Sequence, residues 1–332
     1  MSKPLVSIVI TAFRSRPDHL RGAIASALAQ SWERVEVIVS DDSPDDALRP
    51  LVDAFADPRI RYTHHRPSLG VARNHWWCFG RAKGEYVAIL NHDDSYEVEF
   101  VESAVSPLER EPKAALAFCD HWVMDATGRR LFEESDATSR SWGRSDLREG
   151  LQRSFLRLLV NQTIPMAMGT VFRRSLLPMQ LPDHAGPAYD LWLTYLLARG
   201  GHGAYYVPRR LSSWRMHEAN LTSQRGADWL DGSTDCWLAI GSDPACIEIR
   251  SPARAKAARA LTANAVRALG AGRRAECSRL ARHSLNVAFT PAALTAWSLS
   301  VLPAPIVKPI MAWVRSRSHG ALTCPSRRPA EL

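Results

Sequence analysis

The sequence lacks the motifs of several common enzyme classes. No GxGxxG follows its first predicted strand and no P-loop occurs, which disfavours both a dinucleotide-binding dehydrogenase and a P-loop phosphotransferase. Its six cysteines form no CxxC pair, so neither a zinc ribbon nor a redox motif is indicated. Cys78 and Cys119 lie in apolar surroundings and are expected to be small core residues. No signal peptide precedes the first predicted strand, which predicts a cytoplasmic protein.

Charge is also missing from one long stretch near the C-terminus. Residues 283–307 contain no Lys, Arg, Asp or Glu, but Pro291, Pro303 and Pro305 interrupt the segment and disfavour a membrane-spanning helix. By contrast, residues 250–332 hold 14 Lys and Arg against 2 Asp and Glu, a net charge of +12. Residues 1–249 hold 28 against 32, a net charge of −4. The basic end predicts an anionic surface as a partner.

Two interpretations of this basic end stay open. One is a segment at the interface of an anionic membrane, at the inner face of the plasma membrane, and the other is a helical cap on the catalytic domain. Nucleic acid is not an expected partner, because no nucleic-acid-binding module is recognised. The interfacial interpretation rests on apolar and basic residues of the segment: Trp297, Leu302, Ile306 and Trp313, with Lys308, Arg315 and Arg317.

The rest of the chain alternates between predicted strands and helices. Apolar, β-branched runs predict strands at residues 5–11, 35–40, 60–63, 86–90 and 114–119, and amphipathic spacing predicts helices between them. This alternation predicts a parallel, doubly wound α/β sheet. Residues 133–147 are polar and are expected to form an irregular, mobile loop. Residues 252–285 are predicted to form Ala- and Arg-rich helices.

A polar cluster follows the predicted strand at residues 86–90 directly. It consists of Asn91, His92, Asp93 and Asp94. Ligands of open α/β sheets bind outside the carboxyl ends of the strands. Two adjacent carboxylates there suit a divalent cation and, through it, a diphosphate. The alternative for an acid pair after a strand is a solvated turn.

Four blocks of sequence, in this order, resemble family 2 glycosyltransferases. They are VSIVITAF, VIVSDDSPDD, GVARN followed by GEYVAILNHDD, and YDLWL followed by WRMHEANLT. The resemblance implies a GT-A-type, doubly wound, mostly parallel sheet with a helical C-terminal extension. It places a catalytic domain at residues 1–249, with a nucleotide-sugar half at about 1–120 and an acceptor half at about 121–249. Residues 250–332 form the extension.

The same resemblance implies an inverting glycosyltransferase of the hexosyltransferase type. Its donor is a nucleotide-sugar, expected to be UDP-linked, and its cofactor is Mn2+ or Mg2+. The acceptor is a hydroxyl of a saccharide or lipid-linked molecule, in cell-surface polysaccharide or glycolipid synthesis. Two alternatives stay open. The first is a non-catalytic nucleotide-sugar-binding protein. The second is a nucleotidyltransferase, which needs a Gly-rich loop after the first strand that this sequence does not have.

The resemblance assigns a nucleotide-base pocket to the ends of the first two strands. Thr11, Ala12 and Phe13 are expected to line it, with Phe13 stacking on the base. Asp41 is expected to accept the ring N–H of uracil, and Asp42 is expected to be solvated. The alternatives are that Phe13 packs on its own helix and that Asp41 caps a turn.

Four further residues are expected to bind the nucleotide. Arg73 resembles the family's arginine beside the nucleotide phosphates, and its guanidinium suits that role because its donors match phosphate oxygens. The alternative role for Arg73 is a surface ion pair. Asn91 replaces the first acid of the Asp-x-Asp signature and is expected to contact ribose or a metal-bound water, and His92 beside it is also expected to bind the nucleotide. Arg215 belongs to the R-x-H element with His217, and alternation along an extended segment places both on one face.

The remaining assignments concern metal, donor sugar and catalysis. Asp93 and His217 are expected metal ligands, and Asp94 is expected to contact the donor sugar or support Asp93. Asp190 is the expected general base that takes a proton from the acceptor hydroxyl. The family often has Glu-Asp at the places of Pro187 and Ala188, and the nearest carboxylates in this sequence are Asp190 and Asp183. The alternative role for Asp190 is to cap the following helix.

Overall fold

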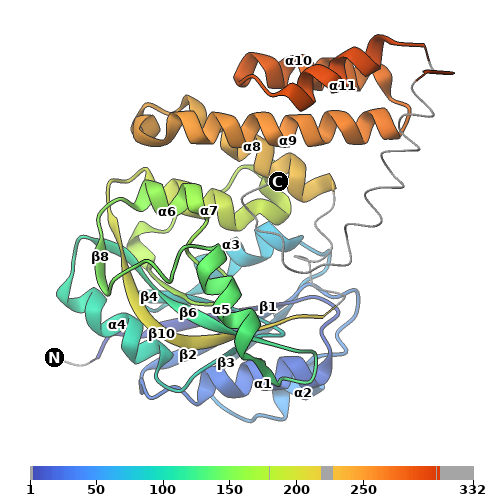
Figure 1. Cartoon of the computed structure of the whole chain (residues 1–332). Coiled ribbons are helices and arrows are strands. Elements are labelled where there is room, and N and C mark those ends of the chain that lie inside the picture. Colours follow the sequence, from blue (N-terminus) through green and yellow to red (C-terminus); the bar gives the residue numbers. More distant parts are fainter. Residues whose placement is uncertain (1–2, 179, 218–226, 304, 307–332) are drawn as a thin grey trace. The chain divides into compact units, whose positions relative to one another are not determined.

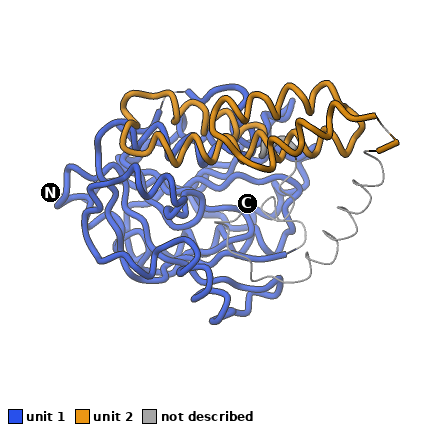
Figure 2. Tube along the Cα trace, turned by 45° about the horizontal axis from the view of Figure 1, so that its top comes forward, with its two compact units in different colours: residues 1–224 blue, residues 225–332 orange. Residues whose placement is uncertain are grey.

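The computed structural model describes residues 3–178, 180–217, 227–303 and 305–306. The chain divides into two compact units, unit 1 with residues 1–224 and unit 2 with residues 225–332 (Figure 2). The domain boundary expected at residue 249 lies inside unit 2. The functional division into a nucleotide-sugar half and an acceptor half stays a prediction.

Unit 1 is built on one mixed sheet with the strand order β3-β2-β1-β4-β9-β6-β10-β5, to which β7 and β8 add at β6 and β10. The strands β3, β2, β1 and β4 are all parallel neighbours, and β9 runs antiparallel between β4 and β6. The strands are β1 (Val6–Ala12), β2 (Val35–Asp41), β3 (Ile60–His64), β4 (Tyr86–Asn91), β5 (Ser95–Tyr96), β6 (Ala114–Met124), β7 (Arg130–Leu131), β8 (Gly150–Gln152), β9 (Thr170–Arg173) and β10 (Gly203–Arg215).

Helices cover both faces of this sheet (Figure 1). On one face, alternate residues of β1 such as Ile8 and Ile10 pack with Leu20 and Ile24 in the main hydrophobic core. The helices of unit 1 are α1 (Pro17–Leu28), α2 (Arg49–Asp53), α3 (Val71–Arg81), α4 (Phe100–Arg110), α5 (Phe132–Ser141), α6 (Phe155–Asn161) and α7 (Tyr189–Ala198), with the 3-10 helices η1 (Arg174–Leu176) and η2 (Asp183–Ala188). The predicted α/β fold class is confirmed, and so are the five predicted strands.

The loop predicted at residues 133–147 is wrong over most of its length, because α5 occupies residues 132–141. This helix is held by hydroxyl groups rather than by an apolar stripe. Buried Ser135 accepts a hydrogen bond from the backbone N–H of Val123 at 2.9 Å, and buried Ser139 donates to Asp120. A helix docked by serines has no apolar periodicity, which is why its sequence resembles a loop.

Unit 2 is a group of helices: α8 (Ala227–Ser242), the 3-10 helix η3 (Pro244–Ile249), α9 (Arg250–Gly270), α10 (Arg274–Val287) and α11 (Pro291–Val301). This confirms the helices predicted at residues 252–285. Small side chains such as Ala265, Ala281 and Ala296 form its core between α9, α10 and α11. In the described residues, no helix is both long enough and apolar enough to cross a membrane. Residues 220–222, Lys308, Trp313, Arg315 and Arg317 lie outside the described residues.

Candidate functional site

The parallel register of β2, β1 and β4 brings the predicted nucleotide residues to one edge of the sheet. Ala12 pairs with Asp41 on β2, and Thr11 pairs with Asn91 on β4. The ends of three neighbouring strands therefore form a continuous polar edge, as expected for parallel strands of an open α/β sheet.

At the β2 end, the carboxylate of Asp41 is completely buried. Its Oδ1 accepts the backbone N–H of Ser43 at 2.9 Å and its Oδ2 accepts the hydroxyl of Tyr62 at 2.7 Å. Burial raises the pKa of Tyr62, and its bonds to the carboxylates of Asp41 and Asp46 add to the effect, so Tyr62 is a stable donor. Phe13 directly follows β1 and is 51% exposed, and the guanidinium of Arg14 lies over its ring at 5.4 Å from the centroid.

Asp42 was expected to be solvated, and this expectation is wrong. Its side chain is buried and accepts hydrogen bonds from Ser68 Oγ at 2.7 Å, Leu69 N at 2.6 Å and Gly70 N at 2.7 Å. Gly70 adopts a φ of 81°, which favours glycine, immediately before α3. Asp42 therefore fixes the turn that leads into the helix carrying Arg73.

Arg73 lies on the surface, where Nη2 pairs with Asp183 Oδ1 at 3.0 Å. This is the alternative that the sequence left open for Arg73, and its phosphate contact stays a prediction. Two positions later, His75 is buried and was missed by the sequence reasoning. Its Nε2 lies 3.2 Å from Thr11 Oγ1, and its ring stacks on Tyr189 at 4.1 Å between centroids. His75 thus connects β1, α3 and α7.

The acid cluster joins the end of β4 to the end of β10. Asp93 Oδ2 lies 2.9 Å from His217 Nε2. Asp94 is buried, and its two oxygens accept hydrogen bonds from the backbone N–H of Arg215 and from Asn91 Nδ2, each at 2.8 Å. Burial raises the pKa of Asp94 well above its usual range, and the charge of Asp93 raises it further.

These contacts distinguish the roles of neighbouring residues. Both carboxylate oxygens of Asp94 accept hydrogen bonds from within the protein, which supports Asp93 as the acid that faces a ligand. The donor-sugar role of Asp94 stays a prediction. The guanidinium of Arg215 donates to the backbone carbonyls of Asp93 at 2.8 Å and Ala126 at 3.2 Å. Arg215 therefore holds the loop after β6 against the acid cluster, and its predicted nucleotide contact stays a prediction.

Asp190 is the second residue of α7, directly after buried Tyr189. Its Oδ1 accepts the backbone N–H of Leu191 at 2.8 Å, so it satisfies one first-turn amide of the helix without being the N-cap, which is Ala188. Its assignment as the base stays a prediction. The stacking of Tyr189 on His75 places this start of α7 beside β1.

With this geometry established, the comparisons with known proteins are decisive on one point. The model of the family described as "Glycosyl transferase family 2" matches residues 7–177. The chain belongs to glycosyl transferase family 2. This confirms the resemblance noted in the sequence.

Relatives within glycosyl transferase family 2 show how far the likeness extends. The chain is 25% identical over 221 residues to an uncharacterized glycosyltransferase of Rickettsia typhi, covering 66% of each chain. It is 33% identical over 136 residues to the succinoglycan biosynthesis protein ExoO of Rhizobium meliloti, covering 40% of this chain and 38% of that protein. It is 28% identical over 119 residues to the Escherichia coli UDP-Glc:alpha-D-GlcNAc-diphosphoundecaprenol beta-1,3-glucosyltransferase WfaP, covering 36% and 47%.

The matched part of the chain spans 66% of the length of the Rickettsia typhi protein, and 21% and 40% of two further uncharacterized glycosyltransferases of Rickettsia. Among solved structures, TarS of S. aureus (residues 1–349, in complex with UDP-GlcNAc) superposes with a TM-score of 0.60 at 13% identity, covering 89% of this chain and 90% of that one. This likeness shows the GT-A fold for the family 2 chain.

The donor set at the edge of the sheet fits a divalent cation bound largely through its substrate. Asp93 supplies a carboxylate oxygen and His217 an imidazole nitrogen, both suitable metal donors, and they point at each other. Within the residues that the structure describes, no group of three or more His, Cys, Asp or Glu side chains is placed to hold a metal. Mg2+ commonly takes one or two protein ligands and fills its other positions with phosphate oxygens and water.

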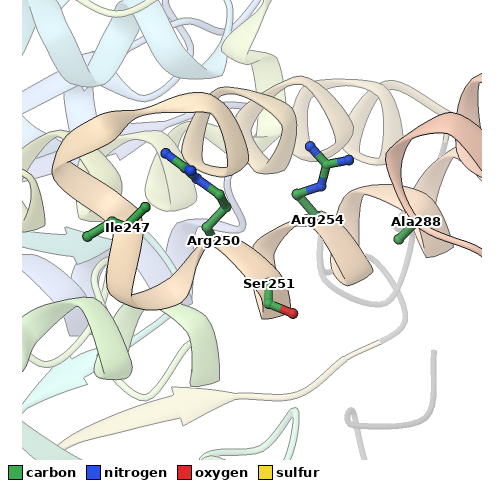
Figure 3. Close-up of a pocket in the computed structure, with 5 residues that line it drawn as sticks. All are labelled: Ile247, Arg250, Ser251, Arg254 and Ala288. Atoms are coloured by element: carbon green, nitrogen blue, oxygen red, sulfur yellow. The ribbon is translucent and has the colours of Figure 1, made fainter.

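Unit 2 contains a separate hollow of about 430 Å3 at the start of α9. Its lining consists of Ile247, Arg250, Ser251, Arg254 and Ala288 (Figure 3). The Nε of Arg254 donates to the backbone carbonyl of Val287 at 3.0 Å, at the end of α10, so this arginine has a structural bond. None of the predicted site residues lines the hollow, and we assign the functional site to the polar edge of unit 1.

Proposed function

We propose that the chain transfers a sugar, with inversion, from a UDP-linked donor to a hydroxyl of a saccharide or lipid-linked acceptor in cell-surface polysaccharide synthesis. The observation that carries this proposal is the Asp93–His217 pair beside Thr11 and Asp41 at one edge of the parallel strands. The names of relatives support it. WfaP is named for a UDP-Glc donor and a diphosphoundecaprenol-linked acceptor, and ExoO for succinoglycan biosynthesis.

In this proposal each group at the edge has one task. Phe13 stacks on the uracil ring. Asp41 accepts the ring N–H with a lone pair that its bonds to Ser43 and Tyr62 leave over, since each carboxylate oxygen can accept two hydrogen bonds. Asp93 and His217 hold Mn2+ or Mg2+, which, when bound, supplies positive charge to the diphosphate leaving group. Asp190 takes the proton of the acceptor hydroxyl as the hydroxyl oxygen attacks the sugar carbon on the face opposite the diphosphate, which inverts that carbon.

Nucleotide release from a panel of UDP-, GDP- and dTDP-sugars tests the reaction, with and without Mn2+ or Mg2+. We expect UDP release from a UDP-sugar that depends on the cation. Binding of a nucleotide-sugar without turnover of any donor would favour the non-catalytic alternative. Release of pyrophosphate from UTP in a separate assay with a sugar 1-phosphate would indicate a nucleotidyltransferase.

The base is tested separately with Asp190→Asn. We expect loss of turnover with UDP binding intact, because the variant removes only the proton acceptor. Asp183→Asn is the matched control, since Asp183 is the other nearby acid and is exposed in its pair with Arg73. Near-native turnover of Asp190→Asn, with loss in Asp183→Asn, would transfer the assignment to Asp183.

For unit 2 we propose contact with an anionic membrane surface on the cytoplasmic side. Helix α11 buries its small residues Ala293, Ala296 and Ser300. Leu294, Trp297 and Val301 are exposed at helical spacing on the other side. Leu299 packs against the core of unit 2, as does Leu302, which the sequence had placed in the interfacial segment. Phe289 and Ile306 are exposed as well: Phe289, at 70%, lies just before this helix, and Ile306 follows it.

The charge of this part of the chain complements such a surface. Residues 250–332 carry a net charge of +12, and each Lys or Arg near an anionic leaflet adds about 1 kcal/mol. We expect the protein to sediment with vesicles that contain phosphatidylglycerol, and a Leu294→Ser/Trp297→Ser/Val301→Ser variant to stay in solution. A native chain that stays in the supernatant with anionic vesicles at low salt would contradict the proposal and favour the helical cap.

A further inference from the structure

Unpaired polar atoms gather around the edge of the sheet. Eight buried side-chain nitrogen or oxygen atoms in the described part of the chain have no hydrogen-bond partner. Three of them, Ser15 Oγ, His19 Nε2 and His92 Nδ1, follow the carboxyl ends of the neighbouring strands β1 and β4. Ser15 and His19 are only 7% and 6% exposed. Because an unsatisfied buried polar group costs free energy, a group of them indicates a missing ligand.

His19 lies next to the predicted metal pair. Its ring centroid is 5.6 Å from that of His217, whose Nε2 contacts Asp93. Asp18 Oδ2 lies 3.9 Å from His19 Nε2, which is beyond hydrogen-bond distance, and that carboxylate is bound to Arg16 instead. The unpaired nitrogen of His19 therefore belongs to the site rather than to a local ion pair.

The surroundings of His19 favour an anion. His19 is in the first turn of α1, where helix amides carry partial positive charge. The side chain of the N-cap residue, Arg16, makes no capping bond with this turn. The imidazole of His19 carries at least one N–H in either protonation state, so it can donate a hydrogen bond to an anion.

We propose that His19, through Nε2, and Ser15, through Oγ, donate hydrogen bonds to the phosphate groups of the nucleotide donor. This rests on the proposed function and adds two substrate-binding residues to it. Bonds to an anionic phosphate would satisfy both buried atoms, and such charge-assisted bonds are stronger than neutral ones. A phosphate explains the pair better than a cation does, because a hydroxyl group and a helix N-terminus both favour an anion.

Calorimetric titration with two ligands, uridine and UDP, tests the proposal, because only UDP carries phosphate. His19→Phe keeps an aromatic ring and removes the nitrogens, and Ser15→Ala removes the hydroxyl. For each variant we expect the Kd for UDP to rise about tenfold and the Kd for uridine to change less than about twofold. His19→Gln should restore part of the UDP affinity, since its amide N–H reaches a similar position.

Ser26→Ala is the matched control on the same helix, because the hydroxyl of Ser26 already donates to the carbonyl of Ala23 at 2.8 Å. It should leave the ratio of the two affinities unchanged. Equal weakening of UDP and uridine in His19→Phe would show a structural role and overturn the proposal, as would unchanged binding of both. If the native chain binds no nucleoside diphosphate from a UDP, GDP and dTDP panel, the proposed function itself fails.

Discussion

Two groups of acidic side chains in unit 1 differ in how their charge is balanced. The first lies in β6, where buried Asp120 accepts a hydrogen bond from Arg144 Nε at 2.7 Å and another from Ser139. Arg210 Nε lies 3.6 Å from the same carboxylate. Burial opposes ionisation of Asp120, but Arg144 and Ser139 outweigh it and hold the pKa of this acid below its ordinary value.

The second group is at the edge of the sheet, where Asp93 and Asp94 are adjacent. The side-chain partners that these acids have are the imidazole of His217 and neutral N–H groups from Asn91 and the Arg215 backbone. The guanidinium of Arg215 donates to the backbone carbonyl of Asp93, and its charge lowers the pKa of Asp94 only in part. Here burial and the neighbouring acid raise the pKa of Asp94 instead of lowering it.

The difference separates a closed structural network from a group with unbalanced negative charge. Asp120 has its cations within the protein, whereas the edge acids would gain from a cation that arrives with a ligand. Buried acids alone therefore do not identify a site, and the balance of charge around them is more informative. Two experiments test this distinction.

The largest effect is expected from Asp120→Asn. Arg144 has a side chain that is 2% exposed, and the variant would leave its charge buried without a carboxylate. Breaking such a pair costs about 3–5 kcal/mol of unfolding free energy. Urea denaturation measures the loss. Glu99→Gln is the control, because Glu99 pairs with Arg209 at the surface, where both side chains are more than half exposed, and should cost less than about 1 kcal/mol. Equal losses of unfolding free energy in the two variants would show that the buried network stabilises the fold no more than a surface ion pair does.

A smaller change in free energy, but a clear loss of turnover, is expected from Asp93→Asn. Losing a ligand of the cation should slow sugar transfer about 100-fold, equivalent to about 3 kcal/mol of transition-state stabilisation. The stability should change little, because asparagine keeps an oxygen for the contact with His217. Steady-state kinetics and thermal unfolding of the same preparation separate the two effects. Native turnover with a large fall in Tm would place Asp93 among the structural acids.

The fold could be predicted from the sequence wherever a strand or helix buries an apolar pattern. The β-branched run at residues 5–11 became β1, and the spacing of Leu20 and Ile24 became the buried face of α1. Helix α5 was missed because hydroxyl groups of Ser135 and Ser139 dock it. Contacts made by hydroxyl groups leave no periodic pattern of apolar residues in the sequence.

The sequence placed Asp41 and Asp93 at the ends of strands, and the structure has them at one edge of the sheet, while their roles stay predictions. The sequence could not separate these acids from their neighbours. The carboxylate of Asp42 accepts hydrogen bonds from the amides of Leu69 and Gly70, and that of Asp94 from the amide of Arg215. These partners lie far away in the sequence. The unpaired nitrogen of His19 is likewise visible only once β10 has brought His217 beside α1.

Buried His75 provides a third case, a titratable group with no charged partner among the interactions that shift its pKa. Burial lowers the pKa of His75 to about 4, from about 6.5 for an exposed histidine. Between these values the unfolded chain binds a proton that the folded chain does not, so stability falls as the pH falls through this window. At pH 5 the loss should reach about 2 kcal/mol.

His75→Phe isolates this contribution, because a phenyl ring can still stack on Tyr189 but does not titrate. Urea denaturation at pH 7, 6 and 5 should show a shallower loss of stability for the variant than for the native chain. The pH range also separates this effect from the β6 group, since Asp120 stabilises the fold above about pH 4 and loses that contribution only below it. If stability falls with pH equally in the two proteins, the pKa of His75 is the same in the folded and the unfolded chain. The environment of His75 between α3 and α7 would then not be dry enough to oppose its protonation.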